Sequence, residues 1–140
     1  MNTRLIIAIL IGSIVSFLLG WVVFGMLMEP YYDTNMIKYK GLYRDEATMR
    51  LWGIYLAQLA WCTLLGFVLN MRPTKLNIGS AFVTGTLVMG LAMLGINLMM
   101  WSSMNLATYQ VYIVDTLTNA VYGGIVAVVI ALILRPKATA

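Results

Sequence analysis

Residues 76–114 read LNIGSAFVTGTLVMGLAMLGINLMMWSSMNLATYQVYIV, a run of 39 residues without a charged side chain. As a single α-helix this run would measure about 58 Å at 1.5 Å per residue, almost twice the thickness of the hydrocarbon core of a bilayer. It must therefore fold back on itself. The polar stretch 102–105 is the best position for the turn, with Asn105 placed to cap the helix that follows. The run predicts two membrane-spanning helices, at about 78–101 and 106–134.

Two earlier stretches are also long and apolar. Residues 5–28 and residues 51–71 contain no charged side chain, and about 20 apolar residues suffice to cross a bilayer. No small-x-small cleavage site follows Met28, so the first stretch is expected to remain a helix of the protein rather than act as a signal peptide. The sequence predicts an all-α integral membrane four-helix bundle in one transmembrane domain over residues 1–140. Its expected spans are about 5–28, 50–71, 78–101 and 106–134, with an outer loop at 29–49.

The composition indicates that lipid is the solvent of most side chains. Hydrophobic residues make up 61% of the chain, charged residues make up 10%, and the mean hydropathy is +0.88. A soluble domain carries about 25% charged residues. The nine basic residues lie near the predicted helix ends, where they can contact anionic lipid headgroups, rather than in a patch suited to nucleic acid. The bilayer is therefore the predicted partner, and no nucleic acid is expected.

Residue types that hold metals and cofactors are scarce. The chain has no histidine, and its one cysteine, Cys62, lies in an apolar stretch and cannot form an internal disulfide. Thioethers bind Cu(I), but without histidine or a cysteine pair the 11 methionines are expected to fill gaps between helices. The sequence predicts no metal, no cofactor and no enzymatic activity, because it contains no catalytic motif.

Small residues recur at every fourth position on two of the predicted helices. Such stripes let helix backbones approach closely inside membranes. They predict helix packing, within the chain or between copies of it, at Gly12, Ser16 and Gly20 in the first span and at Gly123, Ala127 and Ala131 in the fourth.

The two halves of the chain resemble each other. Residues 20–26 (GWVVFGM) and 90–97 (GLAMLGIN) share a GxxxxG spacing. Tyr55 and Tyr112 each precede a polar residue by three positions, and a glycine follows that residue at the same distance in both cases. Two hairpins of equal orientation would be related by an axis along the membrane normal, as in the parallel repeats of some transporters. A duplicated helical hairpin is one prediction of this similarity.

Asp115 is the one ionisable residue well inside a predicted span. Ten residues of helix from Asn105 would place it about 15 Å deep, near the midplane, where a charged carboxylate costs at least ~2.5 kcal/mol. No lysine or arginine lies in any span to pair with it, so it needs polar partners or a proton. Polar and aromatic residues at comparable depth predict a layer of ligand or proton site candidates, which comprises Asp115, Asn119, Gln58, Asn97, Tyr112, Tyr122, Trp21 and Trp61.

Two interpretations of this layer stay open from the sequence. In the first, amides, a carboxyl group and aromatic rings line a site for a small ligand or a proton. In the second, a protonated or amide-bonded Asp115 holds the helices together and has no further role. An acidic residue inside a membrane is costly to retain, which gives the first interpretation its weight.

Three segments resemble a group of small, four-helix bacterial membrane proteins of unknown function. These segments are LLGWVVFGMLMEPYY at residues 18–32, YLAQLAW at 55–61 and YIVDTLTNAVYGG at 112–124. The resemblance covers most of the chain and implies a bacterial inner-membrane location without an established activity. It also implies that Asp115 is the site-like position of the group. The outer loop here is more charged and richer in tyrosine than the pattern of the group.

The expected function is that of an accessory or interaction subunit of a membrane assembly, or of a homo-oligomer. The small size of the chain and the lack of catalytic groups favour this class. The alternative is a small proton-linked transporter, or a small-ligand binder, that uses the layer around Asp115. Four spans alone leave little room for alternating access, which places the transporter second.

Both termini are expected to be cytoplasmic. Four spans place them on one side of the membrane, and the turn between the third and fourth spans, on the opposite side, carries no basic residue. A reporter fused after Ala140 should therefore read cytoplasmic, and a reporter that works only on the outer side would reverse this orientation. The basic residues expected on the cytoplasmic side are Arg4, Arg72, Lys75, Arg135 and Lys137.

Overall fold

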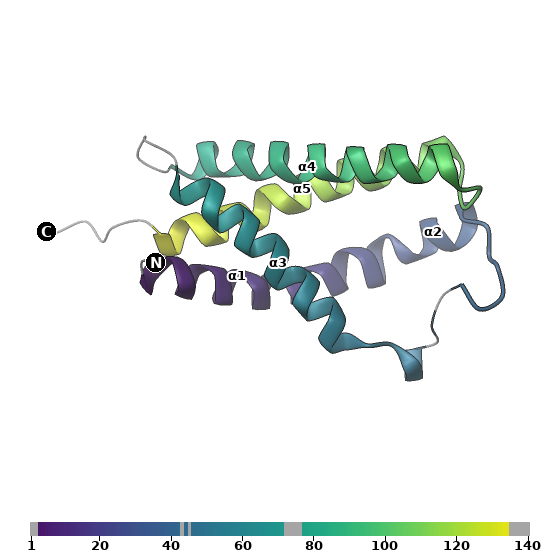
Figure 1. The fold of residues 1–140 in the computed structure, drawn as a ribbon, viewed down its shortest axis with the longest axis horizontal. Helices are drawn as coiled ribbons and strands as arrows, with labels where there is room; N and C mark the ends of the chain where they lie inside the picture. The colour runs from purple at the N-terminus through teal and green to yellow at the C-terminus, as the bar shows by residue number, and fades with distance from the viewer. Residues whose placement is uncertain (1–2, 43, 45, 72–76, 135–140) are drawn as a thin grey trace, which may run out of the picture.

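The computed structural model describes residues 3–42, 44, 46–71 and 77–134, and every regular element within them is helical (Figure 1). In chain order the elements are helix α1 (Thr3–Val22), π-helix η1 (Val23–Leu27), helix α2 (Glu29–Asn35), 3₁₀-helix η2 (Glu46–Thr48), and helices α3 (Leu51–Asn70), α4 (Ile78–Ser103) and α5 (Tyr109–Leu134).

Four helical segments in this described part are long and apolar enough to cross a membrane. They are Thr3–Leu27, Leu51–Asn70, Ile78–Ser103 and Tyr109–Leu134. The predicted all-α fold with four such helices is confirmed. Of the basic residues expected near the termini, Arg72, Lys75, Arg135 and Lys137 lie outside the described residues.

The fourth long helix begins at Tyr109, three residues later than expected, and Asn105 does not cap it. The reason is a contact with the outer loop. The backbone N–H of Ile37 donates to the carbonyl of Leu106 at 2.8 Å, and Met36 and Ala107 form an isolated antiparallel bridge. Residues 104–108 are therefore drawn into an extended pairing and cannot form the first turn of a helix.

The first span ends in a π-helix rather than in a simple α-helical terminus. The N–H of Met28 donates to the carbonyl of Val23 at 2.9 Å, five residues back, which is the wider turn of a π-helix. Helix α2 follows at once, with Pro30 in its first turn, where a missing N–H costs nothing. The chain therefore passes from the first span into α2 without an intervening loop.

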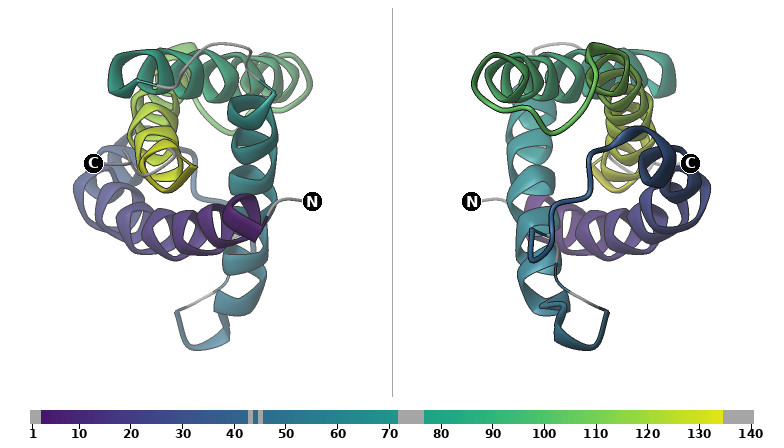
Figure 2. Two further views of the ribbon diagram at one scale, coloured as in Figure 1. Left: turned by 90° about the vertical axis from the view of Figure 1, so that its left-hand side faces the viewer. Right: turned by 90° about the vertical axis from the view of Figure 1, so that its right-hand side faces the viewer.

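The four long helices surround the axis of the molecule in the order α1, α3, α4 and α5, as the end-on views in Figure 2 show. Helices α4 and α5 form the most extensively packed pair, whereas α3 crosses the bundle obliquely and contacts α4 little. Helix α1 begins and helix α5 ends at one end of the molecule, here called the terminal end. The opposite end, here called the loop end, carries α2, residues 36–50 and the turn 104–108.

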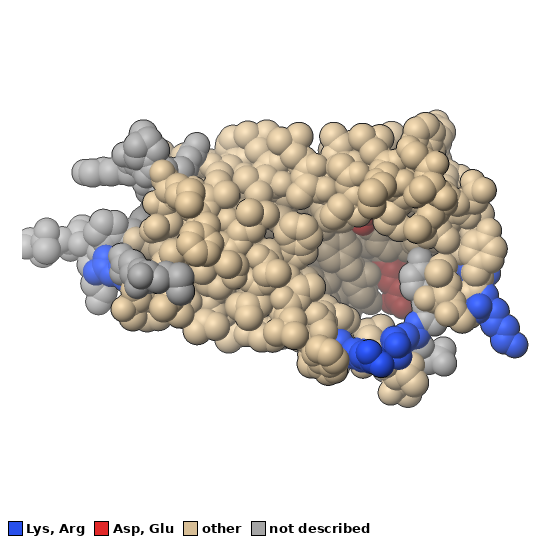
Figure 3. Space-filling view, in the orientation of Figure 1, with Lys and Arg blue, Asp and Glu red and all other residues tan. Residues whose placement is uncertain are grey.

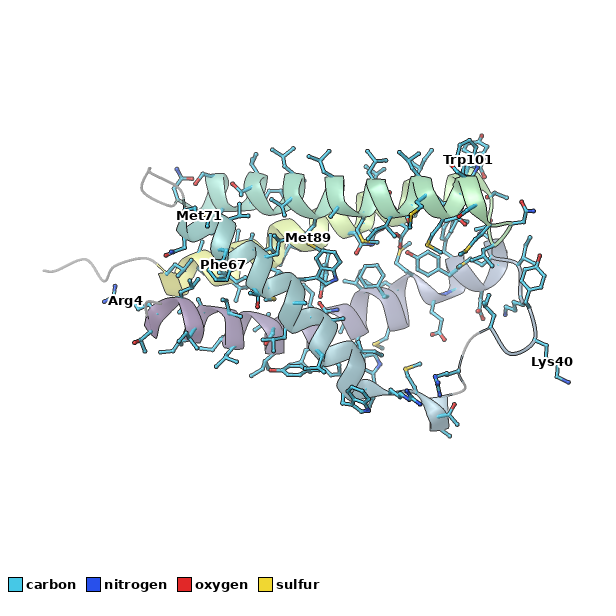
Figure 4. The ribbon with its side chains drawn as sticks, in the orientation of Figure 1. Arg4, Lys40, Phe67, Met71, Met89 and Trp101 are labelled. Carbon is cyan, nitrogen blue, oxygen red and sulfur yellow. The ribbon has the colours of Figure 1, made fainter. Side chains whose placement is uncertain are left out.

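Close contact between α4 and α5 depends on glycine. A Cβ atom at Gly85 would collide with the carbonyl oxygen of Gly123 and with the methyl group of Ala127. Met89 points from α4 into the bundle (Figure 4), and a Cβ atom at Gly123 would collide with its side chain. The fourth-span stripe therefore packs within the chain.

The stripe on α1 also packs inside the bundle. A Cβ atom at Gly12 would lie 2.7 Å from Ile130, and one at Gly20 would lie 3.2 Å from the hydroxyl of Tyr122. Ser16 between them is buried. Both predicted stripes thus bring helices of one chain together. These contacts explain the small residues without packing between two copies of the chain.

The apolar core lies toward the terminal end. It contains the first turns of α1 and α4 and the last turns of α3 and α5. Its buried residues include Leu5, Leu65, Leu69, Ala81 and Ile130. Cys62 is buried there as a free thiol. The side-chain hydrogen bonds that join different long helices lie from the middle of the bundle toward the loop end.

Replacing Gly85 with alanine should destabilise the protein. Alanine is the better helix former by about 1 kcal/mol, but overpacking a tight contact costs about 1–3 kcal/mol. The matched control is Gly95→Ala on the same helix, since a Cβ atom there meets nothing within 4 Å. Thermal unfolding in detergent should show a lower midpoint for G85A and an unchanged or higher one for G95A. Equal midpoints would contradict the packing argument.

Candidate functional site

Asp115 lies on helix α5, six residues after the first residue of the helix, Tyr109. At 1.5 Å per residue this corresponds to about 9 Å along the axis, compared with the 15 Å expected from a start at Asn105. The late start of α5 explains the difference. Asp115 thus lies six residues into its helix rather than ten, in the quarter of α5 nearest the loop end.

Both oxygens of the Asp115 carboxylate accept hydrogen bonds from neutral donors. The hydroxyl of Tyr32 donates to Oδ1 at 2.7 Å, and Nδ2 of Asn97 donates to Oδ2 at 2.8 Å. Each oxygen of the carboxyl group therefore has a hydrogen-bond partner in the protein, and neither partner is charged.

No lysine or arginine in the described ranges forms an ion pair with Asp115. Lys38 is engaged elsewhere, since its ammonium lies 3.2 Å from the carboxylate of Asp33 on the exposed surface. The described residues also contain no group of three or more metal-ligating side chains. Asp115 is thus bonded by neutral groups of the protein, with no cation paired with it among the described residues.

Asn97 is held in place by α5. It is only 5% exposed, and its Nδ2 also lies 2.9 Å from the hydroxyl of Thr116 and 3.3 Å from the carbonyl of Tyr112. Thr116 in turn donates to the same carbonyl at 2.8 Å. The amide is therefore fixed against the first turns of α5 and presents a donor to Asp115.

Tyr32 reaches the carboxylate from outside the four long helices. It lies on α2 and is half-buried, and its ring packs edge-on against that of Tyr31 with centroids 5.9 Å apart. Burial raises the pKa of the Tyr32 hydroxyl, and the hydrogen bond to Asp115 raises it further. The hydroxyl consequently stays protonated at neutral pH and remains a donor.

A second polar cluster joins α1, α3 and α5. The hydroxyl of Tyr122 donates to the carbonyl of Ser16 at 2.6 Å and to Oε1 of Gln58 at 3.0 Å, and the hydroxyl of Ser16 donates to the same Oε1 at 2.6 Å. One turn away, the hydroxyl of Ser13 lies 3.2 Å from that of Tyr55. This cluster ties three helices together through side chains.

The predicted single layer is thus divided into two clusters. Tyr122 lies seven residues beyond Asp115 on the same face of α5, about 10 Å further along the axis. Gln58 meets Tyr122 rather than Asp115 because α3 runs obliquely and its first turns project beyond the bundle (Figure 1). Residue counts from the helix starts place Gln58 and Asp115 at one depth only if the two helices are parallel. Because α3 is tilted, the two residues lie at different levels of the bundle.

The other predicted site residues lie apart from the carboxylate. Asn119 donates to the backbone carbonyl of Asp115 at 2.9 Å and not to its side chain. Trp61 packs against the apolar core. Trp21 on α1 is 64% exposed. Tyr112 is 8% exposed, and its hydroxyl has no hydrogen-bond partner among the described residues.

The surface has two depressions. A groove of about 520 Å³ lies on the outer surface between α4 and α5, and Asn97, Tyr112 and Thr116 form part of its wall beside apolar residues such as Leu94 and Trp101. Figure 3 shows a second depression, a hollow between α3 and the α2 segment, with acidic side chains inside it and basic side chains on its rim.

Sequence reasoning missed three members of these clusters. Tyr32 follows the first span in a short helix, and no periodic pattern indicates which helix it contacts. Thr116 is adjacent to Asp115 in sequence, but only the geometry shows that it orients Asn97. Ser16 was recognised as a small packing residue, although its hydroxyl also bonds Gln58. Ser13 and Ser16 are three residues apart and therefore share one face of the helix, and this pair of hydroxyl groups was the available signal in the sequence.

No protein-family model, no curated protein and no solved structure matches this chain. The resemblance to small four-helix bacterial membrane proteins stays a prediction, and the function must be argued from the site itself.

Replacing Tyr122 with phenylalanine should lower the free energy of unfolding by about 0.5–1.5 kcal/mol, because the hydroxyl that bonds the Ser16 carbonyl and Oε1 of Gln58 is removed. Tyr109→Phe is the control, since the side chain of Tyr109 is exposed. Unfolding midpoints measured in one detergent would compare the two variants. A Y122F midpoint equal to that of Y109F would show that the second cluster contributes little.

Proposed function

We propose that this protein is a small-ligand-binding integral membrane protein and that Asp115 is the centre of its site. One observation carries the proposal: a carboxylate with a neutral donor on each oxygen has no cationic partner within the described residues. Ionisable residues in membrane segments usually mark ligand, ion or proton sites, because their insertion is costly. A cluster that only held helices together would need no charge.

The distribution of polar groups supports access from one side. The Asp115 cluster and the hollow lie toward the loop end, whereas apolar side chains such as Leu69 and Ile130 fill the bundle at the terminal end. A proton path through the bundle would have to cross this apolar region. The geometry therefore favours binding over proton-linked transport. With cytoplasmic termini, in a bacterial inner membrane, the site would face outward.

The test of this proposal compares the wild type with Asp115→Asn by native mass spectrometry after purification in mild detergent. The wild-type particle should carry a bound small molecule, and D115N should lose it while remaining folded, with a cooperative unfolding transition of its own. The control is Asp33→Asn, because Asp33 forms an exposed ion pair with Lys38. A molecule retained by D115N, or absent from the wild type, would count against the site.

An accessory subunit of a larger assembly, or a homo-oligomer, is the second candidate. The groove between α4 and α5 favours it, since a depression of about 520 Å³ on an apolar surface can accept side chains of a partner helix. The same mass measurement decides between the two functions. A particle that contains a second kind of chain would favour the subunit. The proposed duplication of a hairpin would relate α1 and α3 to α4 and α5 in either case.

A further inference from the structure

We propose that the ligand of the Asp115 site presents a primary ammonium group, and that this group replaces the hydroxyl of Tyr32 as the donor to Oδ1 of Asp115. This inference rests on the proposed function and names the class of its ligand. The ammonium can belong to a free amine or to a lipid headgroup, because both present the same three N–H donors.

The first argument is charge. Asp115 accepts at both oxygens and has no described lysine or arginine as a partner, so a cation from outside is the missing element. Ammonium N–H groups make charge-assisted hydrogen bonds with carboxylates, which are about twice as strong as neutral ones. A cationic donor therefore binds a carboxylate oxygen more strongly than the phenol of Tyr32 does.

The second argument concerns the groups around the carboxylate. The ring of Tyr32, whose hydroxyl bonds Asp115, packs edge-on against the ring of Tyr31, and aromatic faces attract organic cations. Tyr112 lies one turn before Asp115 on the same face of α5, and its buried hydroxyl has no partner among the described residues. An ammonium that binds one oxygen of Asp115 needs further acceptors for its remaining two N–H donors, and the Tyr112 hydroxyl is one that no described residue uses.

The third argument weighs against a metal ion. Calcium takes six to eight oxygen ligands, and magnesium requires nearly octahedral oxygen geometry. The described residues offer no group of three metal-ligating side chains, and Asn97 presents its donor nitrogen rather than its oxygen to Asp115. The cluster thus suits a cation that donates hydrogen bonds.

Tyr32 is the group that a ligand can displace. Helix α2 has seven residues, none of them buried, and the Tyr32–Asp115 bond joins it to α5. By contrast, Asn97 is buried and carries bonds to Thr116 and to the Tyr112 carbonyl. Asn97 therefore stays bonded to Oδ2 of Asp115, and Tyr32 on Oδ1 is the partner that a ligand replaces.

Calorimetric titration of the purified protein with ethanolamine, which is an ammonium at neutral pH, tests this inference. Ethylene glycol is the uncharged control. The wild type should bind ethanolamine and not the glycol, D115N should lose at least tenfold in affinity, and D33N should match the wild type. Tyr32→Phe keeps the ring but removes the competing donor, so it should bind about tenfold more tightly.

The source of the ammonium is decided in nanodiscs. Discs that contain phosphatidylethanolamine should weaken ethanolamine binding relative to discs of phosphatidylcholine if a lipid headgroup supplies the group, and should leave it unchanged if a free amine does. Failure of the wild type to bind ethanolamine in both detergent and phosphatidylcholine discs would overturn the ligand class. An unchanged affinity of D115N for ethanolamine would overturn the ligand class too. Weaker binding of ethanolamine by Y32F would overturn the claim that the ammonium replaces the Tyr32 hydroxyl. An Asp115-dependent molecule of another class, seen by mass spectrometry, would leave the proposed function standing.

Discussion

The close approach of α4 and α5 at Gly85 and Gly123 is the constraint on which the rest of the structure depends. Because neither residue has a side chain, the two backbones come into direct contact and fix the register of the hairpin. That register places Asn97 opposite the first turns of α5, where it bonds Asp115, Thr116 and the Tyr112 carbonyl. The polar site is therefore a consequence of a packing contact about three turns away.

The two ends of the bundle differ in what fills them. At the terminal end, apolar side chains of all four long helices pack together. At the loop end, α3 leans away from α4, a hollow opens on one face, and the short helix α2 covers Asp115 through Tyr32 (Figures 1 and 3). Donors from α2 and α4 replace part of the hydration that the carboxyl group of Asp115 loses on burial.

The architecture could be predicted from the sequence because hydrophobic length is a strong signal. The charge-free run 76–114 required a reversal, and the reversal lies where its polar residues are. The site was predicted less completely. Pairing of Asp115 with Asn97 agrees with the expected common depth, but the tilt of α3 moved Gln58 to a separate cluster with Ser16 and Tyr122. Helix tilt depends on packing against neighbours and leaves no periodic pattern in the sequence. Tyr32 was missed for a related reason, since a short helix after a span carries no signal for what it contacts.

The central claim is that the Asp115 carboxyl group, bonded by Tyr32 and Asn97, binds a cationic ligand as a carboxylate. Infrared difference spectroscopy of the wild type against D115N at neutral pH tests it most directly, because a carboxylate and a protonated carboxyl group absorb in separate regions. The account predicts that the wild type shows the additional bands of a carboxylate and no additional band of a protonated carboxyl group. A protonated band that disappears in D115N would contradict it, and Asp115 would then be a neutral structural residue.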